Sequence, residues 1–292
     1  MKTLAVIILN WNRPDDTIEC IESIKYDNSI KIIVVDNGST DDSINKIKTR
    51  FPDIIIVENK TNSGFGEGNN IGIKKAKELY NPNYYFLLNN DTVVKNDTIK
   101  LILDFIEINP EAGIIGPKIL NYYSKEKIWS AGGEIKLWKG WVKNRGEGET
   151  DTGQYNKTEQ VNFISGCAMI VKKEVIETVG YFDKDYFTYF EDADLCIRAI
   201  KHGYSILYYY KPEVYHKCST TCGCEYGELQ SYYRLRNRLL FIRKNTGPLC
   251  FLFFFIFIFP LIFFRDIFRY LRRRKIKELK KVIEGVIDFL CG

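Results

Sequence analysis

Residues 4–12 read Leu-Ala-Val-Ile-Ile-Leu-Asn-Trp-Asn, a run of strand-forming apolar residues that ends abruptly in polar ones. The same pattern returns three times in the first hundred residues, at residues 31–36, 54–58 and 84–88. Stretches typical of helices separate the four runs, at residues 16–25, 42–50 and 68–80. Strands that alternate with helices at this spacing predict βαβ units around a parallel sheet, and hence an α/β fold.

Hydrogen-bonding side chains follow each of these strands. They are Asn10 and Asn12, then Asp36, then the loop at residues 62–70, and finally Asn89, Asn90 and Asp91. In parallel sheets, ligands bind beyond the carboxyl ends of the strands. One polar strand end is ordinary turn chemistry, but four at one edge of a sheet favour a polar ligand.

The loop at residues 62–70 contains Gly64, Gly66 and Gly68, which invites comparison with dinucleotide-binding loops. The spacing is G-x-G-x-G rather than G-x-G-x-x-G, and the loop follows the third strand rather than the first. A dinucleotide cofactor is therefore disfavoured, and no P-loop motif occurs in the chain.

Composition and charge exclude several classes of protein. The 292 residues are 45% hydrophobic and 14% aromatic, enough for a large core and too many for a disordered chain. Residues 265–292 hold nine Lys/Arg and four Asp/Glu, whereas the preceding 264 residues hold 33 of each sign. A neutral body argues against nucleic-acid binding, and a basic tail predicts contact with an anionic membrane.

The apolar run at residues 4–9 is too short for a signal peptide, so we expect a cytoplasmic protein.

The rest of the chain before residue 246 reads as one continuous domain without a linker. Residues 113–153 show no sustained periodicity, and within them residues 132–149 predict a hairpin followed by a mobile loop. Strands are expected at residues 163–171 and 205–210, and helices at residues 173–179, 192–202 and 225–244.

Three acidic or basic side chains stand out as chemistry-bearing candidates. Asp91 is either a turn residue or a ligand for a hard cation such as Mg²⁺ or Mn²⁺, with Asn89 adding an oxygen. Asp192 follows a Phe-rich run, where it is either a helix cap or a general base of raised pKa. His216, one of two histidines, is either structural or a further metal ligand. Cys218, Cys222 and Cys224 do not have the spacing of common zinc sites.

Several strings together resemble glycosyltransferase family 2, most closely its rhamnosyltransferase-like and galactofuranosyltransferase-like branch. They include Val35-Asp-Asn-Gly-Ser-Thr-Asp41, Leu87-Leu-Asn-Asn-Asp-Thr92, Phe190-Glu-Asp-Ala-Asp-Leu195 and Val214-Tyr-His216. The resemblance covers residues 1–245 and implies a GT-A fold, a Rossmann-like mixed sheet flanked by helices. Its nucleotide-sugar-binding half would be residues 1–112 and its acceptor half residues 113–245.

The resemblance also implies roles for individual residues. Asp36 would accept the N3–H of a uracil or thymine ring, and Asn69 would face the ribose-phosphate of the donor. The other residues expected in the nucleotide-sugar site are Asn10, Asn12, Gly64 and Asn90. Asp91 matches the last acid of the D-x-D metal motif, whose first acid is here Asn89, and His216 would complete the metal site. Asp192 matches the catalytic base, with Glu191 beside it.

The implied reaction is inverting transfer of a sugar from a UDP- or dTDP-sugar, with dTDP-rhamnose one candidate, to a hydroxyl of a glycan or lipid-linked acceptor. Two alternatives stay open. A sugar-1-phosphate nucleotidylyltransferase would need an Arg- and Lys-containing loop after the first strand, unlike Asn10-Trp11-Asn12. A catalytically inactive, membrane-tethered sugar-binding protein is favoured by Asn89 but disfavoured by Asp91, Asp192 and His216.

The tail, residues 246–292, is expected to associate with a membrane. Residues 249–264 carry no charge and would span about 24 Å as a helix, less than the ~30 Å of a hydrocarbon core. Apolar residues then recur at helical spacing from Ile276 to Leu290 among many cations. A buried core helix is the alternative. We predict shallow or re-entrant insertion, with the tail along the cytoplasmic face of the cell membrane.

Overall fold

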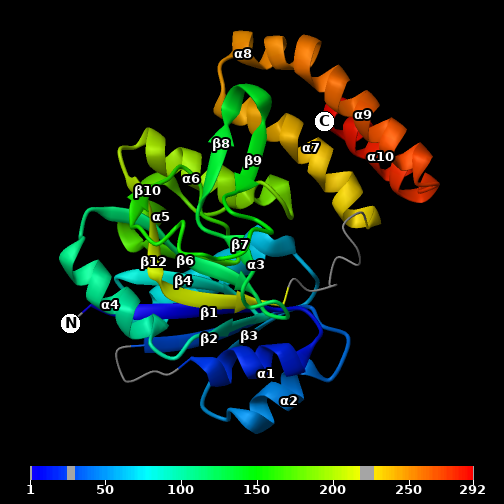
Figure 1. Cartoon of the computed structure of the whole chain (residues 1–292). Coiled ribbons are helices and arrows are strands. Elements are labelled where there is room, and N and C mark those ends of the chain that lie inside the picture. Colours follow the sequence, from blue (N-terminus) through cyan, green and yellow to red (C-terminus); the bar gives the residue numbers. More distant parts are fainter. Residues whose placement is uncertain (1, 25–29, 218–226, 292) are drawn as a thin grey trace.

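The computed structural model describes residues 2–24, 30–217 and 227–291 (Figure 1). A mixed sheet of ten strands forms the centre of this part of the chain. Its strands are β1 Leu4–Asn10, β2 Ile30–Asn37, β3 Ile55–Asn59, β4 Tyr84–Asn89, β5 Thr92–Val94, β6 Ala112–Asn121, β7 Ile128–Ser130, β10 Glu159–Gln160, β11 Ala168–Lys172 and β12 Ser205–His216.

The strand order in the sheet is β10-β12-β6-β11-β4-β1-β2-β3, with β5 paired to β12 and β7 to β6. The first four runs are strands as expected, and β1 is parallel to both β2 and β4. The sheet is not wholly parallel, however, because β11 inserts antiparallel between β4 and β6. The parallel pairing predicted for the first four strands is therefore confirmed, and so is the mixed sheet that the family resemblance implied.

Helices cover both faces of the sheet. Alternate residues of β1 point to opposite faces, so Ala5 and Ile7 join one core and Val6 and Ile8 the other. Three helices supply the core beneath Val6 and Ile8: α1 Pro14–Ser23, α2 Ser43–Arg50 and α4 Thr98–Ile108. Three more supply the core of the opposite face: α3 Gly64–Tyr80, α5 Lys173–Val179 and α6 Glu191–Lys201.

The glycines of the loop at residues 62–70 lie inside helix α3 rather than before it. A Cβ at Gly72 would overlap the side chain of Ile7, and one at Gly68 would overlap Leu9. Gly64 has a φ of +84°, and a Cβ there would strike the carbonyl of Phe187. These glycines let α3 approach the sheet closely, a role that needs no dinucleotide.

The second half of the domain is more ordered than its sequence indicates. The segment at residues 112–121, which we expected to be irregular, is the buried strand β6. The expected hairpin is confirmed as β8 Gly133–Lys136 and β9 Trp141–Asn144, joined by the 3-10 turn Leu137–Lys139. The loop that follows was predicted to be mobile, but Lys118 holds it through Asp151 (2.7 Å) and Asn156.

Four helical segments complete the described chain: α7 Glu228–Asn245, α8 Pro248–Phe253, α9 Phe259–Arg272 and α10 Ile276–Cys291. A π-helical turn at Phe254–Ile258 joins α8 to α9 and absorbs Pro260, which has no N–H to donate. The apolar helix therefore runs unbroken for 25 residues, with a mean hydropathy of 2.3 in its most apolar window. By length and composition it could cross a membrane, since the helix continues beyond the uncharged run at residues 249–264.

Helix α10 returns to pack against α7 (Figure 1). Gly285 lets the two backbones meet, because a Cβ there would lie 2.5 Å from the carbonyl oxygen of Tyr232. The Tyr232 hydroxyl donates to Asp288 (2.6 Å), and the hydroxyls of Ser231 and Tyr270 lie 2.9 Å apart. The chain segments before and after the apolar helix are thus joined to each other.

Candidate active site

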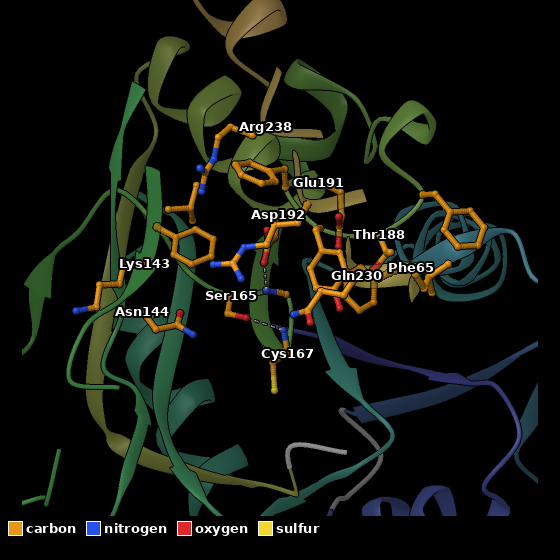
Figure 2. A pocket seen from close by; sticks show the side chains of 18 of the residues that line it. Phe65, Lys143, Asn144, Ser165, Cys167, Thr188, Glu191, Asp192, Gln230 and Arg238 are labelled. Carbon is orange, nitrogen blue, oxygen red and sulfur yellow. Dashed lines mark hydrogen bonds between the residues drawn. The ribbon is translucent and has the colours of Figure 1, made fainter. Parts of the chain in front are cut away.

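A cavity of about 1280 Å³ opens beyond the carboxyl ends of β1 and β4. Its wall joins parts of the chain that are far apart in sequence: strand ends of the sheet, the start of α6, and residues of α7 and α9. Figure 2 shows Glu191 and Asp192 in the middle of this space, with Cys167 on one side and Arg238 on the other. The predicted catalytic and metal residues therefore border a single cavity.

Asp91 and His216 meet at the strand-end side of the cavity. Thr92 closes the turn after β4 by donating to the carbonyl of Asn89 at 2.6 Å. The antiparallel pairing of Thr92 with His216 then brings the histidine beside the aspartate. Nε2 of His216 lies 3.3 Å from Oδ1 of Asp91. Trp129, which sequence reasoning missed, packs edge-on against the imidazole with ring centres 4.6 Å apart.

The donor chemistry at this point fits a hard divalent cation. One carboxylate and one imidazole come from Asp91 and His216, and Asn89 and Asn90 line the same part of the cavity. Within the described ranges, no group of three His, Cys, Asp or Glu residues gathers around one point. A six-coordinate Mg²⁺ or Mn²⁺ would therefore take its remaining oxygens from substrate phosphates or water.

Asp192 is held by backbone donors at the start of α6. Its Oδ2 accepts the N–H of Gly166 at 3.0 Å (Figure 2), and its Oδ1 accepts the N–H of Ala193 at 2.8 Å. Burial raises the pKa of this carboxyl, and the backbone hydrogen bonds only partly oppose the shift. Gly166 must stay small, because a Cβ there would lie 2.9 Å from the ring of Phe65. The result is a fixed carboxylate in the cavity wall, suited to accept a proton.

Glu191 lies beside Asp192 and is also buried. Burial, followed by the charge of Asp192, raises the pKa of the Glu191 carboxyl well above its ordinary value. Its Oε2 is enclosed and meets no hydrogen-bond partner in the described part of the chain. A buried, unsatisfied carboxyl of this kind opposes folding and is typical of functional sites.

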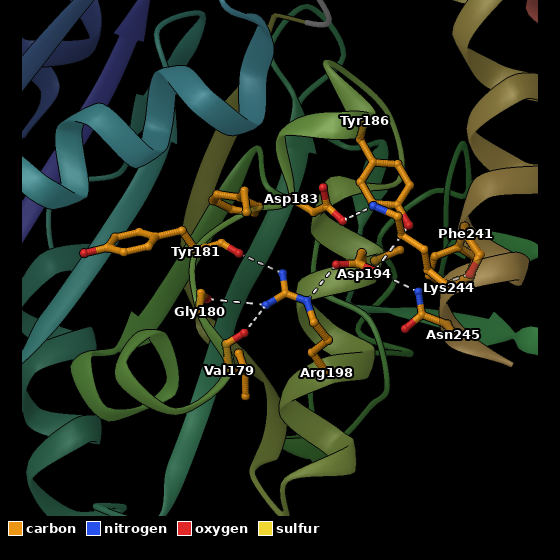
Figure 3. A network of polar contacts seen from close by, with 12 residues as sticks. Val179, Gly180, Tyr181, Asp183, Tyr186, Asp194, Arg198, Phe241, Lys244 and Asn245 are labelled. Atoms are coloured by element: carbon orange, nitrogen blue, oxygen red, sulfur yellow. Dashed lines mark hydrogen bonds and ion pairs between the residues drawn. The ribbon is translucent and has the colours of Figure 1, made fainter. Parts of the chain in front are cut away.

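Asp194, the other acid of this segment, has a structural role (Figure 3). Its Oδ1 accepts from the amide of Asn245 (2.7 Å) and the hydroxyl of Tyr186 (3.2 Å). Its Oδ2 accepts from Arg198 at 2.7 Å, which also donates to the carbonyl of Val179. This network ties α6 to α7 and fixes where α6 begins.

Asn10 and Asp36 end the neighbouring strands β1 and β2 in register with each other. Asn10 donates to Asp36 at 2.7 Å, and Ser39 donates to the same carboxylate through its hydroxyl and its N–H. The N–H of Asn12 donates to the Ser39 hydroxyl at 2.7 Å, and its side-chain oxygen accepts the N–H of Thr40 at 2.9 Å. Ser39 thus joins the three predicted base-pocket residues in one polar network, although none of the three is part of the cavity wall.

The other predicted donor residues lie in different surroundings. Gly64 and Asn90 line the cavity, and Asn90 donates to Thr17 at 3.1 Å. Asn69 is buried inside α3, where its amide donates to the carbonyl of Phe65 at 2.9 Å, and it is not part of the cavity wall. The three cysteines at positions 218, 222 and 224 lie outside the described residues.

Sequence reasoning also missed the arginines of the cavity wall, Arg234, Arg238 and Arg265. The first two are four residues apart in a predicted helix, so they share one helix face. That spacing could have marked them as a pair, but nothing in the sequence points to the cavity they line.

The mixed sheet with helices on both faces has the GT-A fold of known glycosyltransferases. Solved structures with this fold include a mannosyltransferase from Pyrobaculum calidifontis, in complex with GDP-Man and Mn²⁺, with a TM-score of 0.58. It is 15% identical, and the match covers 100% of this chain and 76% of the other. GalNAc-T7, solved with UDP, GalNAc and Mn²⁺, has a TM-score of 0.60 at 16% identity and covers 74% of this chain and 43% of its own.

The chain belongs to glycosyl transferase family 2, whose model matches residues 5–180. It is similar to the dTDP-rhamnosyl transferase RfbF of Shigella flexneri, with 26% identity over 98% of this chain and 95% of the relative. It is also similar to the rhamnosyltransferase WbbL of Escherichia coli K12, with 28% identity over 70% of this chain and 79% of the relative. The N-acetylglucosaminyl-diphospho-decaprenol L-rhamnosyltransferase of Mycobacterium tuberculosis is 26% identical over 69% of this chain and 71% of its own length.

Proposed function

We propose that this glycosyltransferase moves a sugar from a UDP- or dTDP-sugar to a hydroxyl of a lipid-linked or other glycan acceptor, with inversion at the anomeric carbon. The observation that carries the proposal is Asp192, fixed by two backbone N–H groups in the wall of the cavity that also contains Asp91 and His216. The named activities of its rhamnosyltransferase relatives favour dTDP-rhamnose as the donor.

In this mechanism, Asp192 removes the proton from the acceptor hydroxyl as that oxygen attacks the anomeric carbon. The bond between that carbon and the nucleoside diphosphate breaks on the opposite face, so the configuration inverts. A single base with no separate nucleophile suffices for this reaction. Burial suits Asp192 to the task, because a carboxylate of raised pKa is a stronger base.

Asp91, His216 and Asn89 are the residues that would hold a divalent cation. When bound there, Mg²⁺ or Mn²⁺ would supply positive charge to the departing diphosphate. The aromatic edge of Trp129 restricts the rotation of the His216 ring, which keeps its nitrogen toward Asp91. Asn10, Asn12 and Asp36 would bind the base of the nucleotide, and Asp36 would accept the N3–H of uracil or thymine.

We further propose that the enzyme lies on the cytoplasmic face of the cell membrane without crossing it. A helix that crossed the bilayer would place α7 and α10 on opposite sides, but these helices pack together through Tyr232 and Asp288. The apolar helix is instead only 11% buried within its most apolar window. Such a helix would lie in the plane of the membrane interface.

The proposal is tested with purified full-length protein and a panel of nucleotide-sugars, with and without Mn²⁺. Release of UDP or dTDP and the anomeric configuration of the product, determined by NMR, are the two readouts. Turnover with a pyrimidine nucleotide-sugar and an inverted product are expected. Tight donor binding with no turnover on any acceptor would favour the inactive binding protein instead.

The metal assignment has its own test in Asp91→Ala. Nucleotide affinity in Mn²⁺ should fall in this variant, because the site loses its carboxylate. Asp97→Ala removes an exposed acid at the start of α4 and serves as the matched control. Unchanged nucleotide affinity in Asp91→Ala would mean that Asp91 is not a metal ligand.

A further inference from the structure

Three arginines line the cavity on the side of α7 and α9. Arg234 and Arg238 lie one turn apart on α7, and Arg265 comes from α9. Arg265 shares the carboxylate of Asp266 with Arg269, at 2.9 and 3.0 Å. Among the charges that act on Arg238, three belong to arginines, Arg234, Arg265 and Arg269, and one to an acid, Asp266. We call Arg234, Arg238 and Arg265 the arginine cluster; the mechanism above uses none of them.

Arg238 has the least satisfied guanidinium of the arginine cluster. Its Nε is enclosed, and no acceptor for it exists in the described part of the chain. Burial, and next the charge of Arg234, lower the pKa of the Arg238 guanidinium to about 10. A buried cation without a paired anion costs free energy, so this position favours an anionic ligand.

The arginine cluster is distinct from the predicted donor site. The carbonyl of Cys167 accepts the N–H of Asn89 at 2.9 Å, so Cys167 marks the strand-end side of the cavity. Figure 2 shows Arg238 and Cys167 on opposite sides of Asp192. An anion bound by Arg238 would therefore lie across the catalytic base from Asp91, where the acceptor must approach.

Apolar residues continue the cavity wall beyond the arginines. Ile258, Leu261 and Ile262 line the cavity from the π-helical turn and α9. The same helix exposes large side chains along its length, with Leu249 84% and Leu261 70% exposed. Its other exposed apolar residues are Leu252, Phe253, Ile256, Phe257, Phe264, Phe268 and Leu271. The cavity wall thus passes from the Asp192 carboxylate to the arginine cluster and then to an apolar helix.

We propose that the arginine cluster binds the phosphate or diphosphate group of a lipid-linked acceptor whose hydrocarbon chain lies against the apolar helix Pro248–Arg272. The inference rests on the proposed function and deepens it, because it assigns the acceptor class and the residues that select it. Arginine is suited to this task, since its guanidinium pairs with phosphate oxygens through two donors. The cavity wall presents Asp192, then the arginine cluster and then the apolar helix. These would face the sugar, the phosphate and the hydrocarbon chain of such an acceptor, in that order.

The test measures binding of farnesyl diphosphate to the full chain in a nonionic detergent. Farnesol, which lacks the phosphates, and inorganic diphosphate, which lacks the chain, are compared with it. We expect farnesyl diphosphate to bind more tightly than either. Arg238→Gln and Arg265→Gln should each weaken its binding about tenfold, the loss expected for one charged hydrogen bond. Arg265 is largely exposed, so its variant stays informative if the Arg238 variant does not fold.

Arg272→Gln is the matched control, because it removes an exposed arginine from α9 outside the cavity. An equal loss in this control would show a general surface attraction and overturn the proposal, as would equally tight binding of inorganic diphosphate. Affinity for UDP and dTDP in Mn²⁺ is measured in parallel. A matching loss of nucleotide affinity in Arg238→Gln would assign the cluster to the donor and also overturn it. Failure of the wild type to bind either nucleotide would instead count against the proposed function.

Discussion

Asp192 and Asp194 are two residues apart, yet their surroundings give them different chemistry. The carboxylate oxygens of Asp194 accept hydrogen bonds from Arg198, Asn245 and Tyr186, so this acid has a structural role. Within the described residues, Asp192 accepts from backbone N–H groups alone, and it borders the cavity. The sequence alone could not distinguish the two acids, because the partners of Asp194 lie up to 51 residues away.

The first prediction concerns Asp192→Asn. This variant lacks the proton acceptor, so kcat should fall by about 10²–10⁴-fold. Donor affinity should stay close to that of the wild type, because Asp192 is not among the residues predicted to hold the metal or the nucleotide. Turnover and nucleotide binding are measured separately. Turnover within tenfold of the wild type would defeat the assignment of the base.

The second prediction follows from the raised pKa of Glu191. The pKa of Glu191 in the folded protein lies above its ordinary value of 4.5. The free energy of unfolding therefore falls as the pH rises from 4.5 to the pKa of the folded state, because ionised Glu191 is less stable in the fold than in the unfolded chain. Glu191→Gln removes this cost. Its melting temperature should exceed that of the wild type at neutral pH, and the difference should shrink toward pH 4.5. A pH series by differential scanning fluorimetry measures this, and a difference independent of pH would contradict the cause.

Asp36→Ala is the third prediction. Without this carboxylate, the base loses its acceptor, which should cost about 1–3 kcal/mol of donor affinity. Discrimination between uridine and cytidine nucleotides should relax as well. Ser39→Ala removes a hydroxyl that donates to Asp36 but keeps the carboxylate, so it controls for local loosening. Discrimination unchanged from the wild type would mean that another residue reads the base.

At the scale of elements, apolar β-branched runs were reliable signals and glycine was not. The strands β1 to β4 were all predicted, because each is a short apolar run with a polar end. Strand β6 was missed because it contains Gly113, Gly116 and Pro117. In the fold, Tyr204 and Ile164 fill the space above these glycines. The pairing of β12 with β6 is also irregular near the proline.

The site was predicted only where its residues end predicted strands. His216 was expected to lie beyond a strand that stopped at residue 210, but β12 extends to it and pairs it with Thr92. No local pattern in the sequence predicts that pairing, because Thr92 lies 124 residues before His216. The length of the apolar helix was likewise not evident from the uncharged run at residues 249–264, because the helix continues to Arg272 and the π-helical turn accommodates Pro260.

The fourth prediction concerns the contact between α3 and the sheet. Gly72→Val would force a side chain into Ile7 and Val35, so the free energy of unfolding should fall by about 1–3 kcal/mol. Gly247→Ala is the control, because no atom lies within 4 Å of a Cβ built there. Urea denaturation measures both variants. Equal stability of the two would show that α3 can shift away from β1 without cost.

At the scale of the whole molecule, the packing of α10 against α7 places the C-terminus next to the catalytic domain. If the apolar helix lies in the membrane interface, the catalytic domain and the C-terminus share one side of the bilayer. The fifth prediction is that exposed Cys291 resists a membrane-impermeant maleimide in intact cells and reacts after lysis. A variant with Cys250 replaced by Ser excludes the cysteine of the apolar helix as the source of label. Labelling of Cys291 from outside would establish a true span.

The packing of α10 on α7 also fixes the distance between the catalytic domain and the apolar helix. Because the apolar helix is tied at both ends, it cannot swing away from the domain without breaking the contacts of Gly285 and Tyr232. Asp192 therefore stands at a constant height above any surface in which that helix is embedded. Under the proposed function, the distance from the base to the membrane would then help to select the acceptor. A glycan one residue too short or too long would be a poor acceptor even with the correct terminal sugar.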